Sequence, residues 1–341
     1  MNLADLNKIA LAMVTSGKGI LAADESSGTI KKRFDAIGVE STEENRRDYR
    51  EMLFRSTEAM SKYISGVILY DETIWQNAKD GTPLVKLIEQ AGSIPGIKVD
   101  EGTQALPGCP GELVTVGLDK LAERLKKYYE RGARFAKWRA VIDIGQGIPT
   151  TTAIHVNAHA LARYAALCQA AQIVPIVEPE VLMDGGHDID RCYEVTQHVL
   201  RDVFNELYVQ RVALEGMVLK PNMVVSGKKS PKQASVQEVA EKTVRLLKST
   251  VPAAVPGIAF LSGGQSDEEA TAHLDAMNRI GGLPWKLTFS YGRALQAAPQ
   301  KAWSGKAENV AAGQRAFAHR ARMNGLASKG EWETGLEKKV A

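Results

Sequence analysis

Three lysines lie inside short apolar runs of the sequence, where a charged side chain is unusual. Lys98 occurs in PGIKVD, Lys137 in RFAKWR and Lys220 in GMVLKPN. Because lysine is among the residue types least often buried, each of them needs a carboxylate partner or a chemical role. An amine whose charged form is disfavoured by neighbouring cations can attack a carbonyl carbon and form a Schiff base. The lysines therefore indicate chemistry on a ketone or an aldehyde.

Carboxylates end other apolar runs. Asp24 follows KGILAA, and Glu178 and Glu180 lie in IVPIVEPE. The alternative to catalysis is that these carboxylates pair with the three lysines in purely structural ion pairs, which shift pKa values as catalytic groups do. Convergence of three lysines and three carboxylates on one site favours the catalytic interpretation.

The parity of these residues predicts which way they point. Successive side chains of a strand alternate between its two faces, so Phe135, Lys137 and Arg139 share one face. Glu178 and Glu180 share a face of the next run. In GMVLKPN the same rule groups Val218, Lys220 and Asn222 on one face. We expect these faces to be turned toward a common interior.

Two glycine-containing segments near the C-terminal end of the chain indicate a phosphate site. Their candidate binding residues are Ser262, Gly263, Gly264, Ser290, Gly292 and Arg293. Each segment leads into an expected helix, whose N-terminal amides attract an oxyanion, and an arginine can bind phosphate through two hydrogen bonds. The alternative is that the glycines only form turns.

Histidines offer weaker candidates for a metal site. His155 and His159 have helical spacing, but they fall well inside an expected helix and lack the intervening glutamate of zinc proteases. His187 with Asp188 and Asp190 is a second weak candidate. We predict no metal site and no cofactor.

The elements that must position these groups recur along the chain. Eight apolar runs occur at residues 18–24, 66–71, 95–100, 134–139, 173–180, 216–222, 257–264 and 285–292. Segments of helical period separate most of them, such as residues 117–132, which end at Gly132. Helix starts are predicted by capping-box spacings at Ser41 with Glu44, Ser235 with Glu238 and Ser266 with Glu269.

Eightfold alternation of strand and helix predicts a closed parallel TIM (β/α)8 barrel. The expected strand ends are Asp24, Asp71, Asp100, Lys137, Glu178, Lys220, Ser262 and Ser290. An open doubly wound sheet is the alternative, but it binds its nucleotide after the first strand, where no suitable glycine motif occurs. No linker divides the chain, so we expect one catalytic domain over residues 1–341, with a C-terminal helical segment and short tail at about 306–341.

Composition excludes several classes of protein. The chain has 341 residues, of which 44% are hydrophobic and 24% charged, with a formal net charge of +3. Such a chain is too apolar for disorder and lacks the one-sided positive charge that binds nucleic acid. We expect no membrane span and no signal peptide. Cys109, Cys168 and Cys192 fit no disulfide framework, which favours a cytoplasmic location.

Several motifs together resemble a known family. GILAADES, TEENRRDYR, GIKVD, FAKWR, VPIVEPE, LKPNM, FLSGG and FSYGRAL, in this order and spacing, are similar to the class I fructose-1,6-bisphosphate aldolases. The resemblance covers about residues 18–325 and is specific, because the motifs coincide with strand ends of the expected barrel.

The resemblance assigns roles to the charged residues. Lys220 of LKPNM corresponds to the Schiff-base lysine of the family. Glu178 of VEPE corresponds to the acid/base that dehydrates the carbinolamine, with Glu180 beside it. Lys137 of FAKWR supplies the neighbouring positive charge, and Asp24 of AADES helps to deprotonate the C4 hydroxyl of the substrate.

The resemblance also implies substrate-binding residues. Ser262, Gly263, Gly292 and Arg293 correspond to binders of one phosphate. Arg139 lines the site, while Lys98 and Arg33 match positions near the other phosphate or at the mouth of the site.

The activity implied by the resemblance is reversible, metal-independent cleavage of fructose 1,6-bisphosphate to dihydroxyacetone phosphate and glyceraldehyde 3-phosphate, the reaction of an aldehyde-lyase in glycolysis and gluconeogenesis. Family members are commonly homotetramers, so a homotetramer is expected. The sequence ends in GLEKKVA, without the terminal tyrosine of the animal enzymes. Preference among fructose 1,6-bisphosphate, fructose 1-phosphate and sedoheptulose bisphosphate stays open at this point.

Two other functions are alternatives to the aldolase. A barrel that binds phosphosugars without chemistry, as a scaffold, predicts the loss of a catalytic group, whereas Lys220, Glu178, Lys137 and Asp24 are all present. A metal-dependent lyase or isomerase requires histidines clustered at strand ends.

Overall fold

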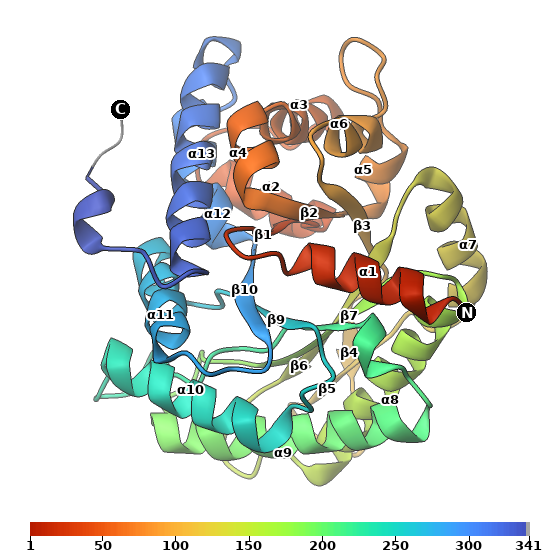
Figure 1. Ribbon diagram of the computed structural model, residues 1–341, viewed down its shortest axis with the longest axis vertical. Coiled ribbons are helices and arrows are strands. Elements are labelled where there is room, and N and C mark those ends of the chain that lie inside the picture. The colour runs from red at the N-terminus through yellow and green to blue at the C-terminus, as the bar shows by residue number, and fades with distance from the viewer. Residues whose placement is uncertain (339–341) are drawn as a thin grey trace.

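The computed structural model describes residues 1–338, so the last three residues of the expected C-terminal tail lie outside the described residues. Within the described chain, eight parallel strands close a barrel in the order β1-β10-β9-β8-β7-β6-β3-β2 (Figure 1). They are β1 (Gly19–Ala23), β2 (Ile64–Leu69), β3 (Ile94–Lys98), β6 (Phe135–Ile142), β7 (Val174–Val181), β8 (Val218–Leu219), β9 (Gly257–Phe260) and β10 (Lys286–Tyr291). The prediction of a TIM barrel is confirmed.

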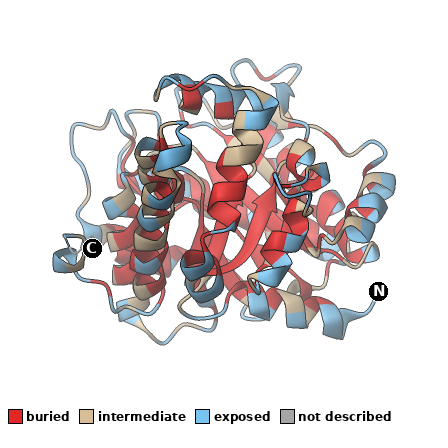
Figure 2. Ribbon diagram, turned by 90° about the horizontal axis from the view of Figure 1, so that it is seen from above, coloured by how far each residue is buried: buried red, intermediate tan, exposed pale blue. Residues whose placement is uncertain are grey.

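Helices surround the barrel, and their outer faces are exposed while the central strands are buried (Figures 1 and 2). They are α1 (Leu3–Met13), α2 (Ser27–Asp35), α3 (Glu43–Phe54), α4 (Thr57–Tyr63), α5 (Asp71–Trp75), α6 (Leu84–Gln90), α7 (Leu121–Arg131), α8 (Thr151–Ala170), α9 (Ile189–Val209), α10 (Val236–Thr250), α11 (Asp267–Ile280), α12 (Arg293–Trp303) and α13 (Val310–Ala327). Single 3-10 turns are η1 (Leu214–Gly216), η2 (Ala307–Asn309) and η3 (Thr334–Leu336). No helix of the described residues is long and apolar enough to cross a membrane.

A short hairpin adds to the predicted elements. Strands β4 (Thr103–Ala105) and β5 (Leu113–Thr115) pair antiparallel in the connection between β3 and α7. Both strands are only three residues long, and β4 is exposed throughout while β5 passes from exposed to buried, so neither gives the sequence a long apolar run from which a strand could be inferred. The hairpin contributes Thr103 and Leu113 to the rim of the main cavity.

Alternation along the strands divides the core into two layers, as the parity argument predicts. Phe135, Ile176 and Val218 belong to a cluster that fills the barrel interior. Their sequence neighbours Ala136, Val177 and Leu219 belong to the larger cluster between barrel and helices. Lys137 and Arg139 share the parity of Phe135 and therefore point inward, above the apolar plug.

Asn222 departs from the predicted parity. Strand β8 ends at Leu219, and Pro221 follows, so the alternation of a strand does not continue to residue 222. The side-chain amide of Asn222 donates to Thr196 of α9, and its oxygen accepts from the backbone N–H of Val181. The expectation that Asn222 faces the interior with Lys220 is wrong.

The predicted helix caps are confirmed at two of three positions. Ser266 and Glu269 form a complete capping box at the start of α11, and Ser235 caps α10. The predicted cap at Ser41 is off by one residue, because the Thr42 side chain accepts from the N–H of Asn45 and α3 begins at Glu43. Threonine and serine both cap helices well, so the sequence pattern alone could not distinguish Ser41 from Thr42 as the cap.

Candidate active site

One large cavity opens at the C-terminal ends of the strands, with a volume of about 1120 Å³. All the residues predicted to act in catalysis or phosphate binding line it: Asp24, Arg33, Lys98, Lys137, Arg139, Glu178, Glu180, Lys220, Ser262, Gly263, Gly264, Ser290, Gly292 and Arg293. They come from seven of the strands or the loops that follow them, so only barrel closure brings them together.

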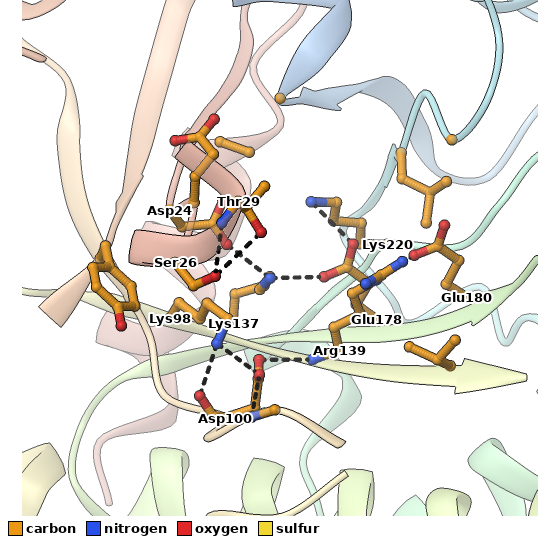
Figure 3. A pocket seen from close by; sticks show the side chains of 18 of the residues that line it. Asp24, Ser26, Thr29, Lys98, Asp100, Lys137, Arg139, Glu178, Glu180 and Lys220 are labelled. Carbon is orange, nitrogen blue, oxygen red and sulfur yellow. Dashed lines mark hydrogen bonds and ion pairs between the residues drawn. The ribbon is translucent and has the colours of Figure 1, made fainter. Parts of the chain in front are cut away.

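Two lysines and two carboxylates form a continuous chain at the base of the cavity (Figure 3). The Nζ of Lys220 lies 3.1 Å from Oε1 of Glu178. The Nζ of Lys137 lies 3.3 Å from the other carboxylate oxygen of Glu178 and 2.7 Å from Oδ2 of Asp24. Lys137, Glu178 and Lys220 are each no more than 4% exposed. One carboxylate therefore contacts both lysines at a site from which water is largely excluded.

Neighbouring charges decide the ionisation of Asp24 and Lys137. Burial raises the pKa of Asp24, but the ammonium groups of Lys137 and Lys220 outweigh it and hold that pKa well below its usual range. Burial lowers the pKa of Lys137, but Asp24 and Glu178 outweigh it and raise that pKa above the ordinary lysine value. Lys137 is therefore a permanent cation next to Glu178, whereas Lys220 shares only the other oxygen of that carboxylate.

Lys98 and Arg139 also line the cavity, and each pairs with a different carboxylate. Lys98 does not join the carboxylate chain, because its Nζ lies 2.7 Å from Asp100. Arg139 donates to the Glu180 carboxylate. Burial lowers the pKa of Arg139, but the nearby Glu180 carboxylate has the larger effect and raises that pKa above the ordinary arginine value. The alternative in which all three lysines pair with Asp24, Glu178 or Glu180 thus does not hold for Lys98, whose partner is Asp100 from its own loop.

The predicted phosphate segments meet on the wall formed by β9 and β10. Gly264 has a φ of +71°, a conformation that favours glycine. The guanidinium of Arg293, at the first position of α12, donates to the backbone oxygen of Gln265. The Oγ of Ser290 is buried without a hydrogen-bond partner among the described residues. Donors from two loops thus face one end of the cavity.

Arg33 lies next to the glycine of the β10 segment. One of its guanidinium nitrogens, Nη2, is 3.6 Å from the position that a Cβ on Gly292 would occupy. Its other nitrogen, Nη1, pairs with the buried carboxylate of Glu25. The prediction placed Arg33 near the second phosphate or at the mouth, and the structure puts it beside the β10 segment.

Sequence reasoning missed two hydroxyl groups in the cavity. Ser26 caps α2, and its Oγ lies 3.1 Å from Oγ1 of Thr29 (Figure 3). Both residues line the cavity. The signal that could have found them is the serine-x-x-threonine spacing directly after the Asp24 strand end, which is typical of a helix start.

The histidines considered for metal binding lie elsewhere. His159 on α8 has its Nδ1 2.9 Å from Glu206 of α9, and His155 lies 3.8 Å from the same carboxylate. Within residues 1–338, no group of three or more histidine, cysteine, aspartate or glutamate side chains is arranged to hold a metal ion.

Comparison with known proteins agrees with this geometry. A family model described as fructose-bisphosphate aldolase class-I matches residues 5–341. A relative from Xanthomonas campestris named probable fructose-bisphosphate aldolase class 1 is 60% identical over 98% of this chain and 100% of its own length. Fructose-bisphosphate aldolase 4, cytosolic, from Arabidopsis thaliana is 55% identical over 94% of this chain and 81% of its own.

A solved structure agrees as well. Fructose-bisphosphate aldolase from Plasmodium falciparum, in a ternary complex with TRAP and a small-molecule inhibitor, superposes with a TM-score of 0.96 at 51% identity. The match covers 98% of this chain and 96% of that one. The chain belongs to the class I fructose-bisphosphate aldolase family.

Proposed function

We propose that this chain cleaves fructose 1,6-bisphosphate reversibly to dihydroxyacetone phosphate and glyceraldehyde 3-phosphate, through a Schiff base on Lys220. The observation that carries the proposal is the contact of 3.1 Å between Lys220 and Glu178, with Lys137 on the far side of the same carboxylate. This arrangement supplies a nucleophile and a proton carrier within hydrogen-bond reach.

The first half of the reaction uses Glu178 twice. Glu178 accepts a proton from the Lys220 ammonium, and the neutral amine attacks the C2 carbonyl to give a carbinolamine. Glu178 then returns a proton to the C2 hydroxyl, which leaves as water, and a protonated imine forms between C2 and Nζ of Lys220. Lys137 stays charged and holds the carboxylate in place for both transfers.

The second half breaks the carbon–carbon bond. Asp24, with Lys137 beside it, helps remove the proton of the C4 hydroxyl, and the C3–C4 bond breaks. Its electron pair moves into the imine to give an enamine, so the imine takes the place of a metal as electron sink. Glyceraldehyde 3-phosphate leaves, C3 gains a proton, and water hydrolyses the imine to release dihydroxyacetone phosphate.

The two phosphates fit the two charged walls of the cavity. Ser262, Gly263, Gly264, Ser290, Gly292, Arg293 and Arg33 surround one end, and Lys98, Arg139, Ser26 and Thr29 line the remainder. Arginines suit phosphate because the guanidinium presents two parallel donors.

Borohydride trapping tests the proposal. The protein is incubated with fructose 1,6-bisphosphate in excess chelator, reduced with borohydride, digested and mapped by mass spectrometry. We expect cleavage and a stable adduct on Lys220. Lys220→Met should remove both adduct and cleavage, whereas Lys86→Met, on the exposed face of α6, should keep both.

Three other outcomes would contradict the proposal. An adduct on another lysine would reject Lys220 as the nucleophile. Cleavage without an adduct that vanishes with chelator would indicate a metal-dependent lyase. Neither adduct nor cleavage, with retained phosphosugar binding, would indicate a barrel that serves as a scaffold.

We also propose a cytoplasmic location and a homotetramer. The cytoplasm is supported by three cysteines that are buried and not disulfide-bonded, and by the Arabidopsis relative, which is named cytosolic. Tetramerisation is supported by the resemblance to the family.

A further inference from the structure

A buried histidine contacts the glutamine that follows the glycines of the β9 loop. His273 of α11 is 7% exposed, and Gln265 is 6% exposed. The Nδ1 of His273 lies 2.6 Å from the side-chain oxygen of Gln265. A glutamine oxygen can only accept, so Nδ1 carries the hydrogen of this bond.

The same glutamine connects both halves of the proposed phosphate site. Its backbone N–H donates to the carbonyl of Ser262 at 3.0 Å, and its side-chain amide donates to that carbonyl at 3.3 Å. Its own carbonyl accepts from the guanidinium of Arg293. Ser262 and Arg293 come from different strand ends, so Gln265 fixes the position of one relative to the other.

His273 is held in its neutral form by its surroundings. Burial lowers the pKa of His273 to about 4, and the Glu269 carboxylate one turn earlier on α11 only partly opposes it. Glu269 is itself engaged by the backbone N–H of Ser266 in the capping box. The His273 ring is therefore a fixed single-tautomer donor above about pH 5.

We propose that His273 and Gln265 are positioning residues for phosphate binding. The His273 donor fixes the rotamer of Gln265, and Gln265 holds Ser262 and Arg293 in the arrangement that receives the phosphate. Neither residue is among the described residues that line the cavity, so both act through Ser262 and Arg293. The inference rests on the proposed aldolase function for its substrate.

A histidine-to-asparagine exchange makes the proposal testable. The side-chain nitrogen of asparagine occupies the place of Nδ1 in histidine, so His273→Asn keeps the donor, whereas His273→Leu keeps the bulk and loses the donor. The readouts are kcat and KM for fructose 1,6-bisphosphate, and the inhibition constant of inorganic phosphate, which measures the phosphate site without chemistry.

We expect His273→Leu to raise KM and the inhibition constant of phosphate by about tenfold, the effect of one lost buried hydrogen bond. The value of kcat at saturation should stay within about twofold, because Lys220 and Glu178 are not touched. His273→Asn should keep all three constants within about twofold of the unchanged protein. Gln265→Leu and the double variant with His273→Leu should show equal losses, since they break one shared path.

Asp275→Asn is the matched control. Asp275 is a buried residue of the same helix, but it faces Arg279 and the backbone of Trp332 on the other side of α11. It should lower the melting temperature without changing KM or phosphate inhibition.

Three results would overturn the proposal. If His273→Leu lowers only the melting temperature, or if Asp275→Asn raises KM equally, the histidine supports the helix and not the phosphate site. Equal losses in His273→Asn and His273→Leu would show that the hydrogen bond is not the cause. The borohydride adduct on Lys220 is measured in each variant, so failure of the aldolase mechanism would be seen separately in the unchanged protein.

Discussion

Lys137 lies between two carboxylates and links them at the base of the site. Its ammonium is 2.7 Å from Asp24 and 3.3 Å from Glu178. Removing one partner of a buried ion pair destabilises a protein far more than removing one partner of an exposed pair, because the remaining buried charge is left without compensation. Asp24 is therefore expected to support stability as well as catalysis.

Asp24→Asn tests this expectation at the residue scale. The substitution should lower the free energy of unfolding by about 3 kcal/mol near neutral pH, because Lys137 stays buried with one carboxylate fewer. It should also reduce cleavage by two orders of magnitude or more, about the contribution of one general base. Chemical denaturation and the aldol cleavage assay measure the two effects.

The stability loss should depend on pH. The pKa of Asp24 is depressed in the folded protein relative to its ordinary value of 3.8. The stabilisation by its carboxylate is therefore complete above pH 3.8 and is lost as the pH falls further. The difference between the unchanged protein and Asp24→Asn should narrow below that pH, and a constant difference would contradict the charge assignment.

At the scale of elements, one ring on β6 determines how β2 and β3 can approach it. A Cβ added to Gly96 would lie 2.3 Å from the ring of Phe135, and one added to Gly66 would lie 2.9 Å from it. Phe135 belongs to the cluster that plugs the barrel beneath Lys137. Glycine is thus required here for close approach, since φ at these positions is not in the left-handed region.

Gly96→Ala should destabilise the protein by about 1–3 kcal/mol through overpacking of the barrel interior. Phe135→Leu should also destabilise it, by leaving a void. The double variant should be more stable than the sum of the two losses predicts, because the smaller side chain makes room for the added methyl group. Thermal unfolding of the three variants measures the coupling, and strict additivity would contradict the packing argument.

Helix α11 gives the protein a second region of pH sensitivity. The pKa of His273 falls from 6.5 to about 4 on folding because the ring is buried. Between these two pH values His273 is protonated in the unfolded chain and neutral in the folded chain. The free energy of unfolding therefore falls as the pH drops from 6.5 toward 4. The loss amounts to about 3 kcal/mol.

His273→Asn removes this group and should flatten the dependence of the melting temperature on pH over that range. Asp275→Asn, on the same helix, should keep the slope of the unchanged protein. An unaltered slope in His273→Asn would show that the histidine does not titrate on unfolding.

At the scale of the whole molecule, the expected homotetramer can be tested by mass. Light scattering coupled to gel filtration should give about four times the chain mass of 37.0 kDa. Apolar residues are exposed at the end of α9, where Tyr208 is 83% and Val209 is 58% exposed. Tyr208→Glu tests whether this end is covered by another copy. A single-chain mass in the unchanged protein would contradict the tetramer.

Much of the molecule was readable from the order of residues alone. The ends of β1, β8 and β9 were found to within two residues, at Asp24, Lys220 and Ser262, because a parallel barrel needs apolar strands and the polar residue that follows each run marks where the strand leaves the core. The predicted ends at Lys137 and Glu178 were wrong, because β6 and β7 continue to Ile142 and Val181. The inward direction of Lys137 and Arg139 followed from alternation, which is a property of any strand. These features are local, so local pattern determines them.

The partners of those residues needed the tertiary structure. Lys98 binds Asp100 rather than the carboxylates of β1 or β7, and Arg33 lies beside Gly292. The hairpin of β4 and β5 and the contact of Asn222 with α9 were also seen only in the structure. The connection from His273 through Gln265 to Arg293 joins α11 to two loops.

Sequence alone thus determined the barrel, most of its strand ends and the types of group that line its mouth. Only the closed structure decided which cation meets which carboxylate, because that depends on distances of a few ångströms between side chains far apart in the chain. Barrel closure places the ends of β1, β6, β7 and β8 around one cavity, and burial there strengthens the attraction between the charges that meet.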